Sequence, residues 1–148
     1  MPYTEAVLLE TMRKSSIITG GSHQASENTV IGGYDVPKGT IVGPSIYAIH
    51  HDPEVWGDPE NFRPERFLSP DGTSVIKHEA FVAFSVGKRA CPGEQLARDE
   101  LFIFAASLCQ RFTFVWGSED AKPDYRSYFS PVLAPKPHNL IIKERQIF

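Results

Sequence analysis

The stretch FSVGKRACPG, residues 84–93, places one cysteine between two basic residues and a Pro-Gly pair, directly before the apolar segment EQLARDELFIFAASL. If a helix begins at Pro92, proline occupies its first position, where the missing N–H costs nothing, and Cys91 caps the helix. Glu94 is then three positions after the cap, as in a capping box with sulfur in place of the usual hydroxyl. The positive end of the helix dipole and the neighbouring basic residues favour a thiolate over a thiol. We therefore expect Cys91 to be an anion.

A cysteine thiolate can serve as a nucleophile, a redox sensor or a metal ligand. A phosphatase-type loop has five residues between cysteine and arginine, whereas Arg98 lies seven positions after Cys91. A zinc site would need further Cys or His ligands close by, and the sequence has no Cys-x-x-Cys. Gly87 and Gly93 would let the backbone approach a broad, flat group, and Phe84 could cover the sulfur. A single thiolate is one of the known ligations of haem iron, so an iron ligand and a redox sensor both remain open.

Size and composition are those of one soluble globular domain, with 148 residues of which 41% are hydrophobic and 22% charged. A net charge of −3 argues against a nucleic-acid surface. No apolar run is long enough for a signal peptide or a membrane span. If the segment between Cys91 and Cys109 is helical, the two are about 27 Å apart along the axis. A disulfide is then excluded, and a reducing compartment is expected.

The segment after the cysteine has the strongest helical pattern in the chain. Apolar side chains recur along residues 93–110 at the spacing of one helix face, as Leu96, Leu101, Phe104, Ala105 and Leu108. Cys109 falls within this helix, and we expect it to be a small core residue there. A second amphipathic helix is predicted over residues 2–14, with Pro2 in its first turn.

Strand patterns occupy much of the rest. The run TVIGGYDVPKGTIV, residues 29–42, has β-branched residues on either side of DVPKG, which predicts a β-hairpin that turns at DVPKG. The strand pattern continues from Ile46 to Ile49. RFTFVW and HNLIIKER, residues 111–116 and 138–145, are further predicted strands. The chain is thus expected to be α+β.

Two segments contain too much proline and glycine for long regular elements. One is the Pro-rich stretch from Lys122 to Pro137, between the last two predicted strands. The other is residues 50–72, with prolines at 53, 59, 64 and 70. Side-chain contacts with the surroundings must hold this second segment in place. His50, His51, His78 and His138 are expected to be solvated or turn residues without a functional role.

Residues 84–93 resemble the haem-binding signature of the cytochrome P450 family, F-x-x-G-x-R-x-C-x-G, at every fixed position. The resemblance implies that Cys91 is the axial ligand of haem b, that Phe84 shields its sulfur and that Arg89 anchors a haem propionate. Gly87 and Gly93 complete the cofactor-binding signature.

Two further motifs support the resemblance. ETMR, residues 10–13, matches the E-x-x-R of the family's K helix, and residues 62–67 resemble the P-E-R-F segment of its meander. By this resemblance Glu10, Arg13 and Arg66 form a structural triad that locks the meander against the helix. Charge-assisted hydrogen bonds of this kind can hold a segment that has no strand or helix bonds of its own.

The resemblance covers the chain almost to Phe148 and is to the microsomal branch. It implies the C-terminal part of one mainly α-helical P450 domain, residues 1–148, running from the K helix through a β-hairpin, the meander and the cysteine loop to the L helix and the C-terminal strands. The family's membrane helix and its central helix with the acid-alcohol pair are expected outside these residues.

Other site residues follow from the resemblance. The family often has a His-Arg pair that reaches a haem propionate, whereas this chain has His23-Gln24. His23 is a candidate propionate contact, with Arg89 as the stronger partner. The loop from Ile17 to Ser22 and the turn near Val132 match regions that contact substrate in relatives. The substrate-contact candidates are Ile17, Ile18, Val132 and Leu133.

The implied function is a haem-thiolate monooxygenase that inserts one oxygen atom from O2 into a lipophilic organic substrate. Electrons would come from NADPH through a reductase, with cytochrome b5 as a second possible donor, on the cytosolic face of the endoplasmic reticulum membrane. A basic surface of Lys77, Lys88, Arg89 and Arg98 could dock an acidic electron-donating flavoprotein. The alternative is a truncated product that is inactive or only binds haem.

Overall fold

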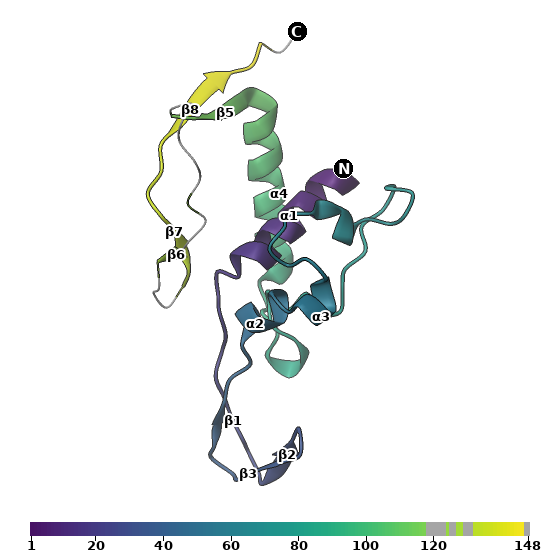
Figure 1. Cartoon of the computed structure of the whole chain (residues 1–148), viewed down its shortest axis with the longest axis vertical. Helices are drawn as coiled ribbons and strands as arrows, with labels where there is room; N and C mark the ends of the chain where they lie inside the picture. Colours follow the sequence, from purple (N-terminus) through teal and green to yellow (C-terminus); the bar gives the residue numbers. More distant parts are fainter. Residues whose placement is uncertain (118–123, 125–126, 129–131, 147–148) are drawn as a thin grey trace.

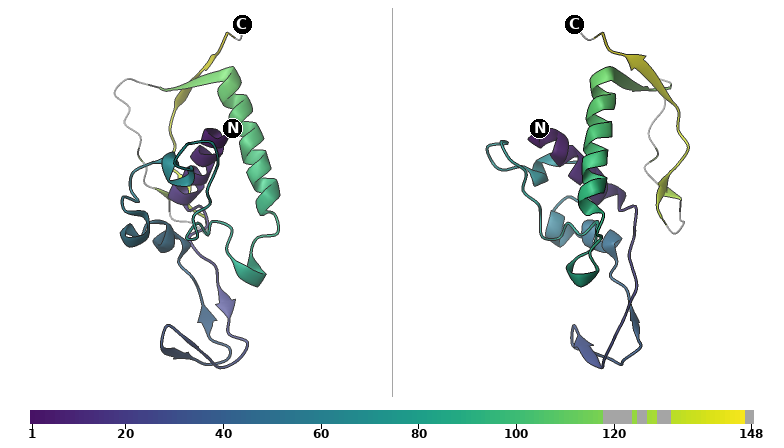
Figure 2. Two further views of the ribbon diagram at one scale, coloured as in Figure 1. Left: turned by 90° about the vertical axis from the view of Figure 1, so that its right-hand side faces the viewer. Right: turned by 180° about the vertical axis from the view of Figure 1, so that it is seen from behind.

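The computed structural model describes residues 1–117, 124, 127–128 and 132–146. Its two long helices, α1 (Pro2–Ser15) and α4 (Glu94–Arg111), pack against each other in the middle of the molecule, as Figures 1 and 2 show. Both helices were expected from the apolar periodicity, and both are present. Short helices and two-stranded sheets surround them, so the described residues form a mixed α/β structure.

The core lies between α1 and the segment that follows it at residues 56–81, which includes most of the second proline-containing stretch, residues 50–72. Ala6 and Leu9 of α1 pack with Trp56, Phe67 and Phe81, all of them buried. The Phe67 ring meets Phe81 edge-on at 5.5 Å and lies 5.9 Å from Trp56. Since aromatic side chains bury large areas, this small cluster holds a segment that has little regular structure.

The strand pattern predicted from Ile46 to Ile49 is wrong, because these residues belong to a helix, α2 (Ile46–His50). Ser45 caps it by accepting a hydrogen bond from the Ala48 N–H at 3.2 Å. Ile46 and His50, one helical turn apart, both face the interior and are buried. A second short helix, α3 (Pro53–Trp56), follows, capped by Asp52. The 3-10 helix η1 (Pro64–Phe67) then packs against α1.

The predicted hairpin is present, but its turn is not DVPKG. Strands β2 (Thr29–Ile31) and β3 (Tyr34–Val36) pair antiparallel across Gly32 and Gly33, whose φ angles are 57° and 87°. Two consecutive positive φ values suit the tight turn of a hairpin, and only glycine adopts them readily. DVPKG instead leads from β3 to β4 (Ile41–Val42), which pairs with β1 (His23–Gln24).

The two predicted C-terminal strands are confirmed. β5 (Phe112–Trp116) and β8 (Leu140–Glu144) pair antiparallel along their whole length, from Phe112 opposite Glu144 to Trp116 opposite Leu140. Between them, β6 (Ser127–Tyr128) pairs with β7 (Ala134–Pro135). Much of the expected Pro-rich stretch lies outside the described residues. The β5–β8 pair and the β2–β3 hairpin lie at opposite ends of the molecule (Figure 1).

Helix α4 differs from expectation in burial. None of its residues is buried, and the side chains of its apolar stripe are wholly or partly exposed. Cys109 is exposed as well, so its prediction as a core residue is wrong. The physical reason is that the described neighbours of α4 in the fold, α1 and β5, cover only part of its surface. No helix of the described residues is long and apolar enough to cross a membrane.

Candidate functional site

The cysteine loop is closed by main-chain hydrogen bonds. The Cys91 N–H donates to the Phe84 carbonyl at 2.8 Å, and Ser85 donates to Val82 at 2.8 Å. Between them the 3-10 helix η2 (Gly87–Arg89) turns the chain. Gly87 has a φ of 71°, a left-handed conformation that favours glycine. The signature residues therefore lie in one tight loop whose ends meet at Phe84 and Cys91.

Cys91 does not cap the following helix, contrary to expectation. Helix α4 begins at Glu94 with Gly93 as its N-cap, two residues later than predicted. Pro92 and Gly93 form a turn, which the Glu94 N–H closes by donating to the Cys91 carbonyl at 3.4 Å. The Glu94 carboxylate does not fold back to the cysteine either, since it binds Lys77 at 2.9 Å.

The exposed surface around Cys91 fits a flat group ligated by one sulfur. The cysteine is free and exposed, and Arg89 beside it is exposed as well. A Cβ atom added at Gly87 would have no neighbour within 4 Å, and one at Gly93 would meet only the Cys91 Sγ, at 3.8 Å. Gly93 thus keeps side-chain atoms away from the sulfur, and Gly87 borders open space. A single exposed cysteine is the kind of donor that binds haem iron through a thiolate.

Glu10, Arg13 and Arg66 meet in the interior. The Glu10 carboxylate accepts two hydrogen bonds from Arg13, at 2.7 and 2.9 Å, and one from the Arg66 Nε at 3.2 Å. Glu10 and Arg13 are fully buried, and the Arg66 side chain is 5% exposed. A main-chain N–H of Arg63 also donates to Glu10, at 3.0 Å. The E-x-x-R helix and the P-E-R-F segment are thereby joined by charge-assisted bonds.

Burial alone would raise the pKa of Glu10. The hydrogen bonds and charge of Arg13, together with the Arg63 N–H and the Arg66 charge, outweigh it and hold that pKa below its usual value. The carboxylate is therefore ionised, as a countercharge to two guanidinium groups.

The sequence did not reveal how far this cluster extends. Arg13 also donates to the main-chain oxygens of His50 and Pro59, at 2.5 and 2.8 Å. Arg66 binds the Asp58 carboxylate at 2.9 Å, as well as the main-chain oxygens of Trp56, Asp58 and Asn61. Both guanidinium groups also lie over the Trp56 ring, at 5.2 and 6.0 Å from its centre. Main-chain acceptors carry no residue-type signal, which is why the sequence could not show them.

His50 is the main functional candidate that sequence reasoning missed. It was expected to be solvated, yet it is fully buried and both ring nitrogens have partners. Burial and the charge of Arg13 lower its pKa to about 4. The available signal was Ser45 as a helix cap, which would have placed His50 one turn after the apolar Ile46.

The two predicted substrate-contact segments lie side by side. The Leu133 N–H donates to the Ile17 carbonyl at 2.8 Å, which joins the loop after α1 to the C-terminal region. Ile17, Ile18 and Val132 are exposed, and Leu133 is half-buried. His23 lies on β1, paired with Val42, and is exposed.

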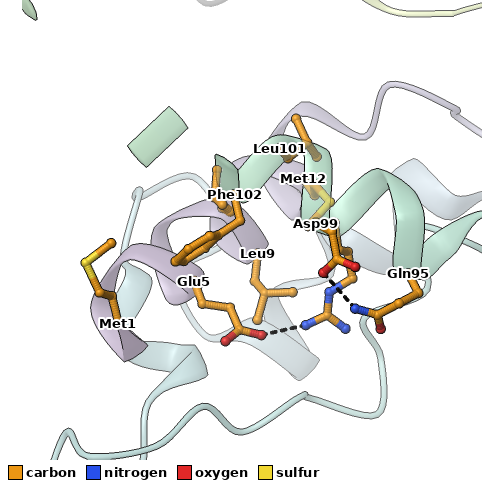
Figure 3. A pocket seen from close by; sticks show the side chains of 10 residues that line it. Met1, Glu5, Leu9, Met12, Gln95, Asp99, Leu101 and Phe102 are labelled. Atoms are coloured by element: carbon orange, nitrogen blue, oxygen red, sulfur yellow. Dashed lines mark hydrogen bonds and ion pairs between the residues drawn. The ribbon is translucent and has the colours of Figure 1, made fainter. Parts of the chain in front are cut away.

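Half of the predicted basic surface is engaged in ion pairs. Arg98 binds Glu5 at 2.8 Å across a cavity of about 360 Å³ between α1 and α4, and Figure 3 shows this pair together with the Gln95–Asp99 bond. Lys77 is held by Glu94. Lys88 and Arg89, the cations closest to the cysteine in sequence, are exposed.

Comparison with known proteins gives a consistent result. Residues 1–142 match the Cytochrome P450 family. The chain is 46% identical over 146 residues to Cytochrome P450 2U1 of Bos taurus, which covers 98% of this chain and 26% of that protein. It is 40% identical to Farnesoate epoxidase of Bombyx mori, covering 100% of this chain and 30% of the epoxidase.

A solved structure agrees. The fold superimposes on a zebra fish cytochrome P450 solved with abiraterone at a TM-score of 0.87 and 41% identity, covering 99% of this chain and 34% of that one. The chain thus spans between a quarter and a third of the length of these relatives. The cysteine loop, the buried Glu-Arg-Arg cluster and the match over residues 1–142 together show that the chain belongs to the cytochrome P450 family.

Proposed function

We propose that residues 1–148 are the C-terminal part of a single P450 domain that acts as a haem-thiolate monooxygenase. The observation that carries the proposal is the exposed Cys91 in a closed loop with all fixed positions of the haem-binding signature. The activity would insert one oxygen atom from O2 into a lipophilic organic substrate. Electrons would come from NADPH through a reductase, with cytochrome b5 as a further donor.

Each signature residue has a proposed role. Cys91 holds the iron of haem b through its sulfur, and Phe84, whose carbonyl binds the Cys91 N–H, shields that sulfur. Gly87 and Gly93 keep the surface clear, and Arg89 and His23 bind the propionates. When bound, the haem supplies the redox chemistry that activates O2, and the thiolate favours O–O cleavage. Glu10, Arg13 and Arg66 are structural, since their buried cluster is closed to substrate.

Relatives support the substrate class and the location. One relative is named as an epoxidase of farnesoate, an oxygen-adding activity, and another P450 structure contains abiraterone. Ile17, Ile18, Val132 and Leu133 offer apolar side chains that suit a lipophilic substrate. Lys88 and Arg89 would contribute to docking of the reductase, because exposed charges steer transient encounters. By likeness to the microsomal relatives, the protein acts at the cytosolic face of the endoplasmic reticulum membrane.

The test is the carbon monoxide difference spectrum of reduced protein, recorded on the longest natural chain that contains residues 1–148. Wild type and Cys109→Ala should both give the band of thiolate-ligated haem, because Cys109 is an exposed cysteine outside the loop. Cys91→Ala should lose the band completely. A wild type without the band, or a Cys91→Ala variant that keeps it, would refute the proposal. A band without turnover of any lipophilic substrate would favour a product that only binds haem.

A further inference from the structure

The two ring nitrogens of His50 join two different parts of the fold. Nε2 accepts a hydrogen bond from the main-chain N–H of Val82 at 3.0 Å. Nδ1 lies 2.9 Å from the Ser16 Oγ. Ser16 directly follows α1, and Val82 precedes the cysteine loop. One buried side chain therefore connects the first helix to the loop that carries Cys91.

These partners require one form of the ring. The Val82 N–H can only donate, so Nε2 must carry no proton. The Ser16 hydroxyl donates to the Arg13 carbonyl at 2.8 Å, which leaves its oxygen to accept from Nδ1. The ring is therefore neutral, with its proton on Nδ1. Arg13 on α1 and His51, directly after α2, are the charged and titratable groups that act on it, and both disfavour a second proton. In residues 81–84, the groups that contact the His50 ring are the Val82 main-chain N–H and the Phe81 ring, and neither carries a charge.

Val82 lies at the start of the main-chain hydrogen bonds that lead to Cys91. The Phe81 ring stacks on His50 with centres 5.6 Å apart and planes inclined by 16°. The Val82 carbonyl then accepts from Ser85, and the Phe84 carbonyl accepts from Cys91, both at 2.8 Å. Since these bonds follow one another along ten residues, a shift at Val82 would be passed to the cysteine.

His50 is also tied to the charged cluster. Its main-chain oxygen accepts the hydrogen bond from the Arg13 Nη1. The His50 ring thus binds Val82, which precedes the cysteine loop, while the His50 main chain is held by Arg13, the partner of Glu10.

We propose that His50 is a positioning residue that holds the Cys91 loop at a fixed place relative to α1 and its Glu10–Arg13–Arg66 cluster. The proposal rests on the proposed function, because the place of Cys91 matters there as the place of an iron ligand. Loss of the acceptor for Val82 should loosen the loop and reduce the share of haem that is bound through a thiolate.

Two substitutions separate positioning from mere filling of the core. A glutamine at position 50 can place its amide oxygen near the site of Nε2 and still accept from Val82. An asparagine is shorter; it can donate to Ser16 in place of Nδ1 but leaves the Val82 N–H unpaired. If His50 only filled space in the core, both substitutions would change the exchange at Val82 to a similar extent. His51→Gln is the control, because its ring stacks on Tyr47 at the surface and not on the loop.

Hydrogen–deuterium exchange of peptides covering residues 81–85 and the carbon monoxide spectrum are measured on the longest natural chain. His50→Asn should speed exchange at Val82 about tenfold or more, as expected for a lost buried hydrogen bond, and lower the thiolate-ligated share. His50→Gln and His51→Gln should stay within about twofold of wild type in exchange. Equal effects of Asn and Gln, or unchanged exchange in His50→Asn, would overturn the proposal.

The two readouts keep the proposals apart. If wild type gave no thiolate band, the proposed function would fail, while exchange at Val82 would still decide the role of His50. Should His50→Asn not fold, spectra of wild-type protein with ¹⁵N-labelled histidine decide instead. They must show His50 protonated on Nδ1 and unprotonated on Nε2, and a ring protonated on Nε2 would refute the assignment.

Discussion

Glu10 shows at the scale of one residue why a buried charge needs all its partners. Its two oxygens accept from Arg13, Arg66 and the Arg63 main chain, and the described buried polar side-chain atoms all have partners. Removing charges from water is costly, and only this complete set of bonds offsets the cost. The cluster is therefore better evidence for a unique geometry than for high stability.

We predict that Glu10→Gln destabilises the fold by about 3–5 kcal/mol, because it leaves the buried Arg13 without its countercharge. Glu60→Gln is the matched control. It breaks an exposed pair with Lys14 at 3.0 Å and should cost less than about 1 kcal/mol. Urea denaturation of the three proteins at neutral pH measures both values. Equal losses would show that the Glu10 cluster is no more than a surface pair.

His50 predicts how stability depends on pH. Its pKa falls from 6.5 to about 4 on folding, so the unfolded chain binds the proton more readily. Its contribution is fully present above pH 6.5 and is lost as the pH falls toward 4, on the order of 3 kcal/mol in all. Urea denaturation between pH 7 and pH 4 should show this loss in wild type and a shallower slope in His50→Gln. Equal slopes in wild type and His50→Gln would mean that folding does not lower the pKa of this ring.

At the scale of elements, the predictions that held rest on periodicity over many residues. The apolar spacing in α1 and α4 and the β-branched runs of β5 and β8 were sufficient, because long patterns average over single exceptions. Short elements were missed where one polar residue decides. Ser45 caps α2, so residues that look like a strand form a helix. The hairpin turns at Gly32 and Gly33, whose φ angles are positive, and not at DVPKG.

Two neighbouring glycines test the junction between α1 and the hairpin. A Cβ atom at Gly20 would lie 2.6 Å from the Pro44 carbonyl oxygen, whereas one at Gly21 would meet nothing within 4 Å. The two segments cannot separate without loss, because Gly20 and Ser45 form an isolated β-bridge between them. Gly20→Ala should cost about 1–3 kcal/mol and Gly21→Ala no more than about 0.5 kcal/mol. Thermal unfolding of the pair provides the comparison, and equal melting temperatures would contradict the clash.

At the scale of the whole molecule, the unburied stripe on α4 has consequences in solution. Leu96 and Phe104 are each 65% exposed, and Ile103 is 61% exposed. Contiguous apolar surface of this kind promotes association. The 148-residue chain should therefore self-associate, with a sedimentation coefficient that rises with concentration. Leu96→Lys combined with Phe104→Lys should reduce the rise, whereas Glu100→Lys, which adds charge without removing apolar surface, should not. A wild-type sedimentation coefficient that does not change with concentration would show that the stripe does not cause association.

The site could be predicted from the sequence only where chemistry resides in side chains. The signature around Cys91 and the meeting of Glu10, Arg13 and Arg66 were stated from motifs, and the structure places the last three in one cluster. Contacts made by main-chain atoms had no such signal. They include the main-chain oxygens of His50 and Pro59, which accept from Arg13, and the Val82 N–H, which donates to the His50 ring.

The bond between Leu133 and Ile17 suggests how this protein could change its preferences over evolutionary time. It joins a main-chain N–H to a main-chain oxygen, so every amino acid except proline at position 133 preserves it. Side chains at both positions can therefore be exchanged while the distance between the two segments stays the same. On the proposed role of these segments as substrate contacts, selectivity could then change through point substitutions while the scaffold stays as it is.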